Sequence, residues 1–195
     1  AFVHADGGAS TQVVAAAQAS GARLIDVRVP PRKLPVGTGR KRTGRRILAV
    51  AADCAIGKKY SALALDQAMR EAGLKSTFRA TGQTGIMIAG EGIPIDAVVA
   101  DFISGAAELL SPDNDPEHWD IIEGQGSIFH PGYSGVSLGL LHGAGQPAGR
   151  AGSLPRDRPD GQRARLVLAV DGRAGRGGRL AAGAPDVAQP VQRRG

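Results

Sequence analysis

A glycine and a lysine, set between an apolar run and a helix-like segment, are the first residues here that point to chemistry. The stretch AVAADCAIGKKYSALALDQAM, residues 49–69, has the outline of a phosphate-binding loop. In such loops, N–H groups at a helix start bind phosphate oxygens, glycine permits close approach and lysine adds positive charge. We therefore predict a site for a phosphate-bearing cofactor. Its candidate residues are Asp53, Gly57, Lys58, Lys59 and Ser61.

The loop departs from common nucleotide loops at the position after Lys58. Lys59 stands where a serine or threonine hydroxyl usually holds magnesium, and Ser61 is a displaced substitute. Three alternatives stay open: a working nucleotide loop, the same loop used for another anionic ligand, or a loop that has lost its ligand.

A carboxylate and an imidazole are the candidate catalytic groups. Glu123 ends an apolar run before two glycines, where a carboxylate can act as a general base or bind a metal. The alternative is that Glu123 only caps loop N–H groups. His130 precedes a proline in a loop, a position that favours a site role over core packing. If the ligand is ATP, Asp101 and Glu123 are candidates for binding magnesium. Otherwise no metal is expected.

Polar side chains in the glycine-rich loops are candidates for binding a substrate. Hydroxyl and amide groups form hydrogen bonds in either direction, and a guanidinium can hold a carboxylate. The candidate substrate-binding residues are Arg79, Thr81, Gln83, Thr84, Gln125, Tyr133 and Ser134.

An alternation of strands and helices must position these loops. Continuous apolar runs predict buried strands, and a Gly after a periodic segment marks a helix end. The expected strands are 46–52, 75–80 and 119–123. The expected helices are 58–72, 95–110 and 138–143, with a loop over 81–92. This order predicts an α/β fold, a parallel sheet flanked by helices, with ligands bound at the carboxyl ends of the strands.

The first 31 residues have a different organisation. A helix over 10–20 and a buried strand over 23–29 cannot form a core alone, so residues 1–31 are interpreted as the end of a preceding, Rossmann-like domain. Residues 32–45 form a basic linker rich in Pro and Gly. Its side chains are expected either to be solvated or to reach an anionic ligand. The phosphate-loop domain is assigned to 46–143.

Net charge is confined to the last 52 residues. Residues 144–195 contain ten arginines, no lysine and four aspartates, a net charge of +6, and the rest of the chain is balanced. A nucleic-acid partner is therefore not expected. No uncharged run is long enough to predict a membrane span. The single cysteine excludes an internal disulfide framework and favours a cytoplasmic location. Homo-oligomerisation stays open.

Three stretches together carry a family resemblance. DCAIGKK, ATGQTGIMIAGEGIPIDAVVADFISGAAE and EGQGSIFHPGYSGVSLGLLHG closely resemble the D-glutamate N-acetyltransferase-like family, over about residues 24–143. This resemblance implies a phosphate-loop domain similar to dethiobiotin synthetase. It implies that the loop holds the phosphates of acetyl-CoA, and that the parent protein moves the acetyl group to the amino group of D-glutamate or a related D-amino acid. The alternatives are an ATP-dependent ligase or kinase using magnesium, and a non-catalytic nucleotide-binding relic.

Two departures from the family pattern affect these expectations. The family usually has Gly-Thr where this chain has Ala51-Ala52, and a left-handed turn there costs alanine about 1 kcal/mol. The family also continues past residue 143 with a strand of the type Leu-Val-Leu-Cys-His-Glu. A shifted reading of the degenerate codons for 151–157 can spell that strand. Residues 144–195 are therefore interpreted as out of frame, or as a disordered tail, and the chain as an inactive fragment truncated at its start.

Overall fold

The apolar run before the predicted phosphate-binding loop forms the central strand of the sheet. In the computed structural model, which describes residues 2–3, 11–31, 33–145, 151–157 and 163–170, this run forms β3 (Arg45–Ala51). Successive side chains point to opposite faces, so Ile47 and Ala49 enter one core cluster and Leu48 and Val50 enter the other. Because both faces are apolar, the strand is buried on both sides.

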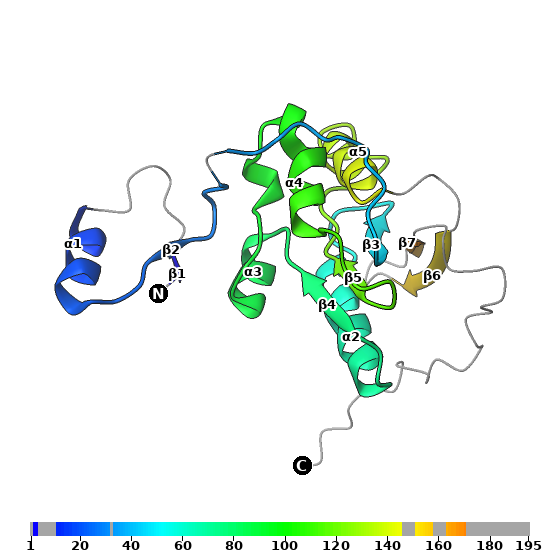
Figure 1. Cartoon of the computed structure of the whole chain (residues 1–195). Coiled ribbons are helices and arrows are strands. Elements are labelled where there is room, and N and C mark those ends of the chain that lie inside the picture. Colours follow the sequence, from blue (N-terminus) through cyan, green and yellow to red (C-terminus); the bar gives the residue numbers. More distant parts are fainter. Residues whose placement is uncertain (1, 4–10, 32, 146–150, 158–162, 171–195) are drawn as a thin grey trace, which may run out of the picture.

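Two more strands run parallel to β3. β5 (Trp119–Ile122) pairs with β3 on one side and with β4 (Ser76–Arg79) on the other, giving the order β4-β5-β3 (Figure 1). Parallel strands end at the same edge of a sheet, so the loops after all three strands meet there. The predicted α/β fold with a parallel sheet flanked by helices is confirmed.

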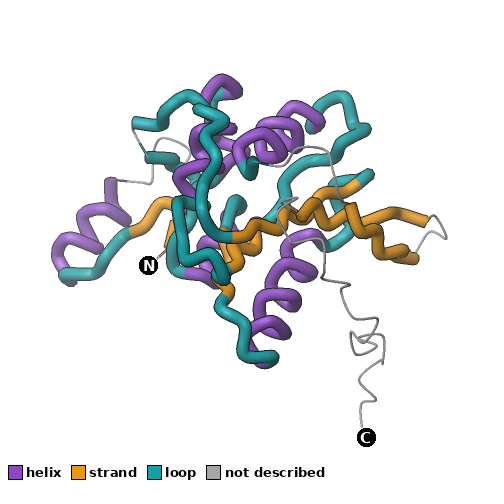
Figure 2. The backbone as a smooth tube through the Cα atoms, turned by 45° about the vertical axis from the view of Figure 1, so that its right-hand side comes forward, coloured by secondary structure: helices purple, strands orange, loops and turns teal. Residues whose placement is uncertain are grey.

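Helices cover both faces of this sheet, as Figure 2 shows. α2 (Lys58–Glu71) packs on one face through side chains that include Ala62 and Met69. α4 (Ile103–Leu110) and α5 (Ser134–Gly143) pack on the other. α2 ends as predicted, because Gly73 takes the left-handed conformation (φ 78°) that closes a helix. No helix of the described residues is long and apolar enough to cross a membrane.

Two predictions between β4 and α4 were wrong. The segment 81–92, predicted as a loop, contains α3 (Gln83–Ala89). Gly82 precedes this helix and Gly90 follows it, so the two glycines mark the ends of a helix and not a continuous loop. Gly90 has a φ of 80°, which suits a helix end.

The segment 95–110, predicted as one helix, is two 3₁₀ turns, η1 (Ile95–Ala97) and η2 (Ala100–Phe102), followed by α4. Val98 and Val99, with ψ of 135° and 136°, interrupt it, in keeping with the extended preference of β-branched residues.

The N-terminal segment forms β1 (Phe2–Val3), α1 (Thr11–Ser20) and β2 (Ile25–Asp26). The strand predicted over 23–29 is shorter because its described partner, β1, offers only two residues for pairing. Val27 is buried in the core cluster on the α2 side of the sheet. The assignment of residues 1–31 to a preceding domain stays a prediction.

The basic linker is not simply solvated. Arg42 in the linker and Arg46 just after it are buried, and their guanidinium groups donate hydrogen bonds to backbone carbonyls around the end of α4. Arg40 and Arg45 pair with Asp113 and Glu117 on the surface. Arg42 and Arg46 therefore support the fold, and for these two side chains neither expectation, solvation or contact with a ligand, holds.

Beyond residue 145 the structure describes two strands. β7 (Arg163–Val170) pairs antiparallel with β3, and β6 (Ala151–Asp157) pairs antiparallel with β7. These segments form strands, in contrast to the disordered alternative for 144–195. The out-of-frame hypothesis stays a prediction, and the rest of that predicted tail lies outside the described residues.

Candidate functional site

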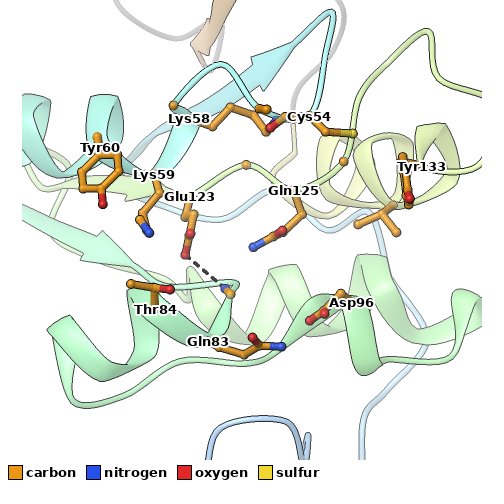
Figure 3. Close-up of a pocket in the computed structure, with 16 residues that line it drawn as sticks. Cys54, Lys58, Lys59, Tyr60, Gln83, Thr84, Asp96, Glu123, Gln125 and Tyr133 are labelled. Atoms are coloured by element: carbon orange, nitrogen blue, oxygen red, sulfur yellow. Dashed lines mark hydrogen bonds between the residues drawn. The ribbon is translucent and has the colours of Figure 1, made fainter. Parts of the chain in front are cut away.

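A cavity of about 620 Å³ lies where the loops after β3, β4 and β5 meet. The start of α2 forms one wall, the start of α3 forms the wall opposite, and the loop after β5 lies between them (Figure 3). This is the edge at which open parallel sheets bind ligands. Eight predicted site residues line the cavity: Gly57, Lys58, Lys59, Gln83, Thr84, Glu123, Gln125 and Tyr133.

The predicted phosphate-binding loop forms its turn without backbone strain. Gly57 precedes α2 with a φ of 85°, a conformation that favours glycine. No described residue other than glycine has a positive φ, so Ala51 and Ala52 fit the loop without the expected left-handed cost. The carbonyl of Ala52 accepts a hydrogen bond from the Ser127 hydroxyl at 2.7 Å, which ties this loop to the loop after β5.

Lys58 is folded back onto its own loop. Its Nζ donates to the backbone carbonyls of Asp53 and Cys54, both at 3.1 Å. The residue is only 6% exposed, and burial lowers the pKa of its ammonium group. An anion in the cavity would favour the charged form, so binding a phosphate and retaining a proton on Lys58 support each other.

Glu123 forms the floor of the cavity, at the end of β5. Its Oε2 accepts hydrogen bonds from the N–H groups of Thr81 (2.9 Å) and Gly82 (3.1 Å). No described residue donates a hydrogen bond to Oε1. Burial raises the pKa of the carboxyl group, and the two N–H groups and Lys59 oppose that rise. A buried carboxylate with a raised pKa is suited to general base chemistry near neutral pH.

Three glycines allow close packing around this carboxylate. A Cβ at Gly85 would lie 2.2 Å from Glu123 Oε2, and one at Gly82 would lie 2.2 Å from Gln125 Nε2. A Cβ at Gly124 would lie 1.5 Å from the Ala49 carbonyl. The glycines therefore hold the floor of the cavity in place by allowing close packing.

Several predicted site residues lie outside the cavity lining. Arg79 donates to the buried Asp120 at 2.7 Å. The Thr81 hydroxyl donates to the Glu123 backbone carbonyl, so Thr81 is buried in the wall. His130 is exposed and contacts the Tyr133 ring, with a centroid distance of 4.5 Å. The other predicted residues that the cavity lining does not include are Asp53, Ser61, Asp101 and Ser134.

Among the cavity residues that the sequence did not indicate are Tyr60 and Asp96. Tyr60 is 65% exposed, and no feature of the sequence pattern indicated that it lines the cavity. Asp96 was assigned to a continuous helix, whereas it lies in a 3₁₀ turn that returns to the cavity. It also pairs with Arg28, which brings the N-terminal segment to the cavity rim.

The comparison with known families agrees with this geometry. A family model described as a domain of unknown function (DUF1611_C), P-loop domain, matches residues 35–149. The chain belongs to this family. The matched range contains every residue that lines the cavity.

Two curated relatives and one solved structure are similar to the chain. A protein of Tritonibacter scottomollicae named D-glutamate N-acetyltransferase is 59% identical over 69% of the chain and 40% of its own length. One of the same name from a Pseudoalteromonas species is 54% identical over 68% and 40%. The crystal structure of a DUF1611 family protein from Anabaena variabilis matches with a TM-score of 0.58 and 42% identity, over 64% of the chain and 36% of its own. The chain thus spans less than half the length of these proteins.

Proposed function

We propose that the cavity binds the CoA part of acetyl-CoA, and that the protein transfers the acetyl group to the amino group of D-glutamate or a related D-amino acid. The observation that carries this proposal is the meeting of a phosphate loop and a buried carboxylate, Lys58 and Glu123, in one cavity. The names of the two curated relatives support the choice of acyl donor and acceptor.

Glu123 is the general base in this proposal. It removes a proton from the substrate ammonium group, and the neutral amine attacks the thioester carbonyl carbon. A C–N bond forms, and loop N–H groups stabilise the oxyanion. When the C–S bond breaks, the CoA thiolate takes up the proton that the nitrogen loses, and the proton on Glu123 passes to solvent. Gln83, Thr84 and Gln125 offer hydrogen bonds to the polar groups of the substrate.

The test uses a chimera in which residues 35–149 of this chain replace the matching segment of the Tritonibacter relative. Thiol release from acetyl-CoA is measured with and without D-glutamate, and phosphate release from ATP is measured in parallel. We expect thiol release that requires D-glutamate. A silent chimera beside an active relative contradicts the proposal, and phosphate release alone indicates an ATP-dependent ligase or kinase.

Replacing Lys58 with alanine in the chimera is expected to weaken acetyl-CoA binding about tenfold or more, because a charge-assisted contact to phosphate is lost. KM for acetyl-CoA rises accordingly. The matched control is Lys75→Ala, which removes a lysine that pairs with Asp115 outside the cavity. Equal KM values for acetyl-CoA in the two variants would show that Lys58 does not contribute to binding the cofactor.

Replacing Gly85 with alanine is expected to lower turnover about tenfold or more by displacing the Glu123 carboxylate, since a misplaced catalytic group is costly. Alanine favours a helix, so α3 should persist. Gly135→Ala is the matched control, because a Cβ there meets nothing within 4 Å. Turnover and circular dichroism of the two chimera variants are compared. Unchanged turnover in Gly85→Ala would show that the close contact does not position Glu123.

A further inference from the structure

Lys59 occupies the position that decides how a phosphate loop handles a metal ion. In phosphate loops of nucleotide-hydrolysing enzymes, the Ser or Thr after the loop lysine holds Mg²⁺ through its hydroxyl. Here that residue is a second lysine, and its side chain lines the cavity. Figure 3 shows its amine between the Tyr60 ring and Glu123, directed into the cavity.

Two groups interact with the Lys59 ammonium group. The Lys59 Nζ lies 4.6 Å from the centroid of the Tyr60 ring, within the range of a cation–π interaction. It also interacts electrostatically with Glu123 on the cavity floor. The ammonium is thus attracted by an aromatic ring on one side and by a carboxylate on the other. The Lys59 ammonium group presents three N–H donors to a ligand in the cavity.

The residues present do not fit a magnesium ion well. Magnesium prefers near-octahedral oxygen ligands, and the hydroxyl that usually provides one is absent at position 59. Within the part of the chain that the structure describes, no three His, Cys, Asp or Glu side chains gather closely enough to hold a metal. Oε2 of Glu123 already accepts two N–H hydrogen bonds. A second cation beside Lys59 would also be repelled by its charge.

We propose that Lys59 takes the place of the magnesium ion at this phosphate loop, so that Lys58 and Lys59 together bind a diphosphate group without a metal. This inference rests on the proposed function, because a diphosphate is the part of CoA that would occupy the loop. The linking diphosphate of CoA carries two negative charges, which two ammonium groups can neutralise. The geometry therefore favours metal-free CoA over magnesium-ATP.

The test is isothermal titration calorimetry on the full chain, with CoA and with inorganic pyrophosphate, each in EDTA and in excess MgCl₂. The affinity of the unaltered chain for CoA is expected to change less than about twofold between the two conditions. Lys59→Ser, which restores the usual hydroxyl, is expected to lose about tenfold in affinity in EDTA and to recover with MgCl₂. Lys59→Arg keeps the charge and should stay within about threefold of the unaltered chain.

Lys75→Ser is the matched control, because it removes one exposed lysine charge away from the cavity. Binding that requires MgCl₂ overturns the inference, and so does a Lys59→Ser chain that binds normally in EDTA. Metal-free binding of pyrophosphate without binding of CoA supports the inference and contradicts the proposed acyl donor. Absence of binding by both probes overturns the inference as well.

Discussion

Glu123→Gln in the chimera is expected to lower kcat/KM for acetyl transfer about 100- to 1,000-fold. Glutamine keeps the shape of the side chain and an oxygen for the N–H groups of Thr81 and Gly82, but it cannot accept a proton from the substrate. General base catalysis contributes about this much to the rates of other enzymes. The measurement is D-glutamate-dependent thiol release at saturating acetyl-CoA.

The affinity for CoA distinguishes a variant that has lost only its general base from one whose binding site is damaged. Because Lys58 and the start of α2 remain in place, calorimetry on Glu123→Gln should give a dissociation constant within about threefold of the unaltered chain. Turnover that survives the substitution would show that another group takes the proton. In that case His130, which lies on the loop after β5, would be the next residue to replace.

The pH dependence follows from the burial of Glu123. Burial raises the pKa of this carboxyl group, and the base must be ionised to accept a proton. We therefore expect kcat/KM to fall as the pH drops through a pKa above that of an ordinary glutamate.

The raised pKa of Glu123 also means that ionising this carboxyl group destabilises the fold as pH rises, so Glu123→Gln should keep or raise the thermal midpoint of unfolding at pH 7. A lower midpoint would indicate structural damage.

The sheet and its cavity edge could be predicted because their signals are local. The apolar run of β3 alternates correctly between two core faces, and Gly73 ends α2 where a periodic pattern stops. The loops after parallel strands meet at one edge as a matter of topology. Gly57, Lys58 and Glu123 could therefore be placed together without coordinates, and the cavity contains all three.

The segment after β4 could not be predicted for the opposite reason. Gly82 and Gly90 have the composition of a loop, yet they border the short helix α3, whose Gly85 packs against Glu123. That contact joins residues 38 positions apart, and periodicity carries no information about it. Arg79 was predicted to bind the substrate because of its charge. Its guanidinium instead forms an ion pair with the buried Asp120 on the neighbouring strand.

Arg42→Met is expected to lower the free energy of unfolding by about 3 kcal/mol, the largest loss of stability that we predict for a side chain outside the cavity. The guanidinium donates to the carbonyls of Glu108 and Ser111 at the end of α4 and to that of Gly143 at the end of α5. Carbonyls at a helix end lack partners within the helix, and a cation there also complements the helix dipole. Methionine fills the space but satisfies none of them.

Urea unfolding of the full chain, followed by circular dichroism, measures this loss against a matched control. Arg40→Met removes an exposed arginine of the same segment that pairs with Asp113, and such surface pairs contribute about 0–1 kcal/mol. Similar midpoints for the two variants would mean that water replaces Arg42 at both helix ends. A clear difference would show that the basic segment before β3 acts as a clamp on α4 and α5. Those helices cover the sheet face opposite α2, so the clamp supports β3 and β5, the strands that lead into the loops before Lys58 and at Glu123.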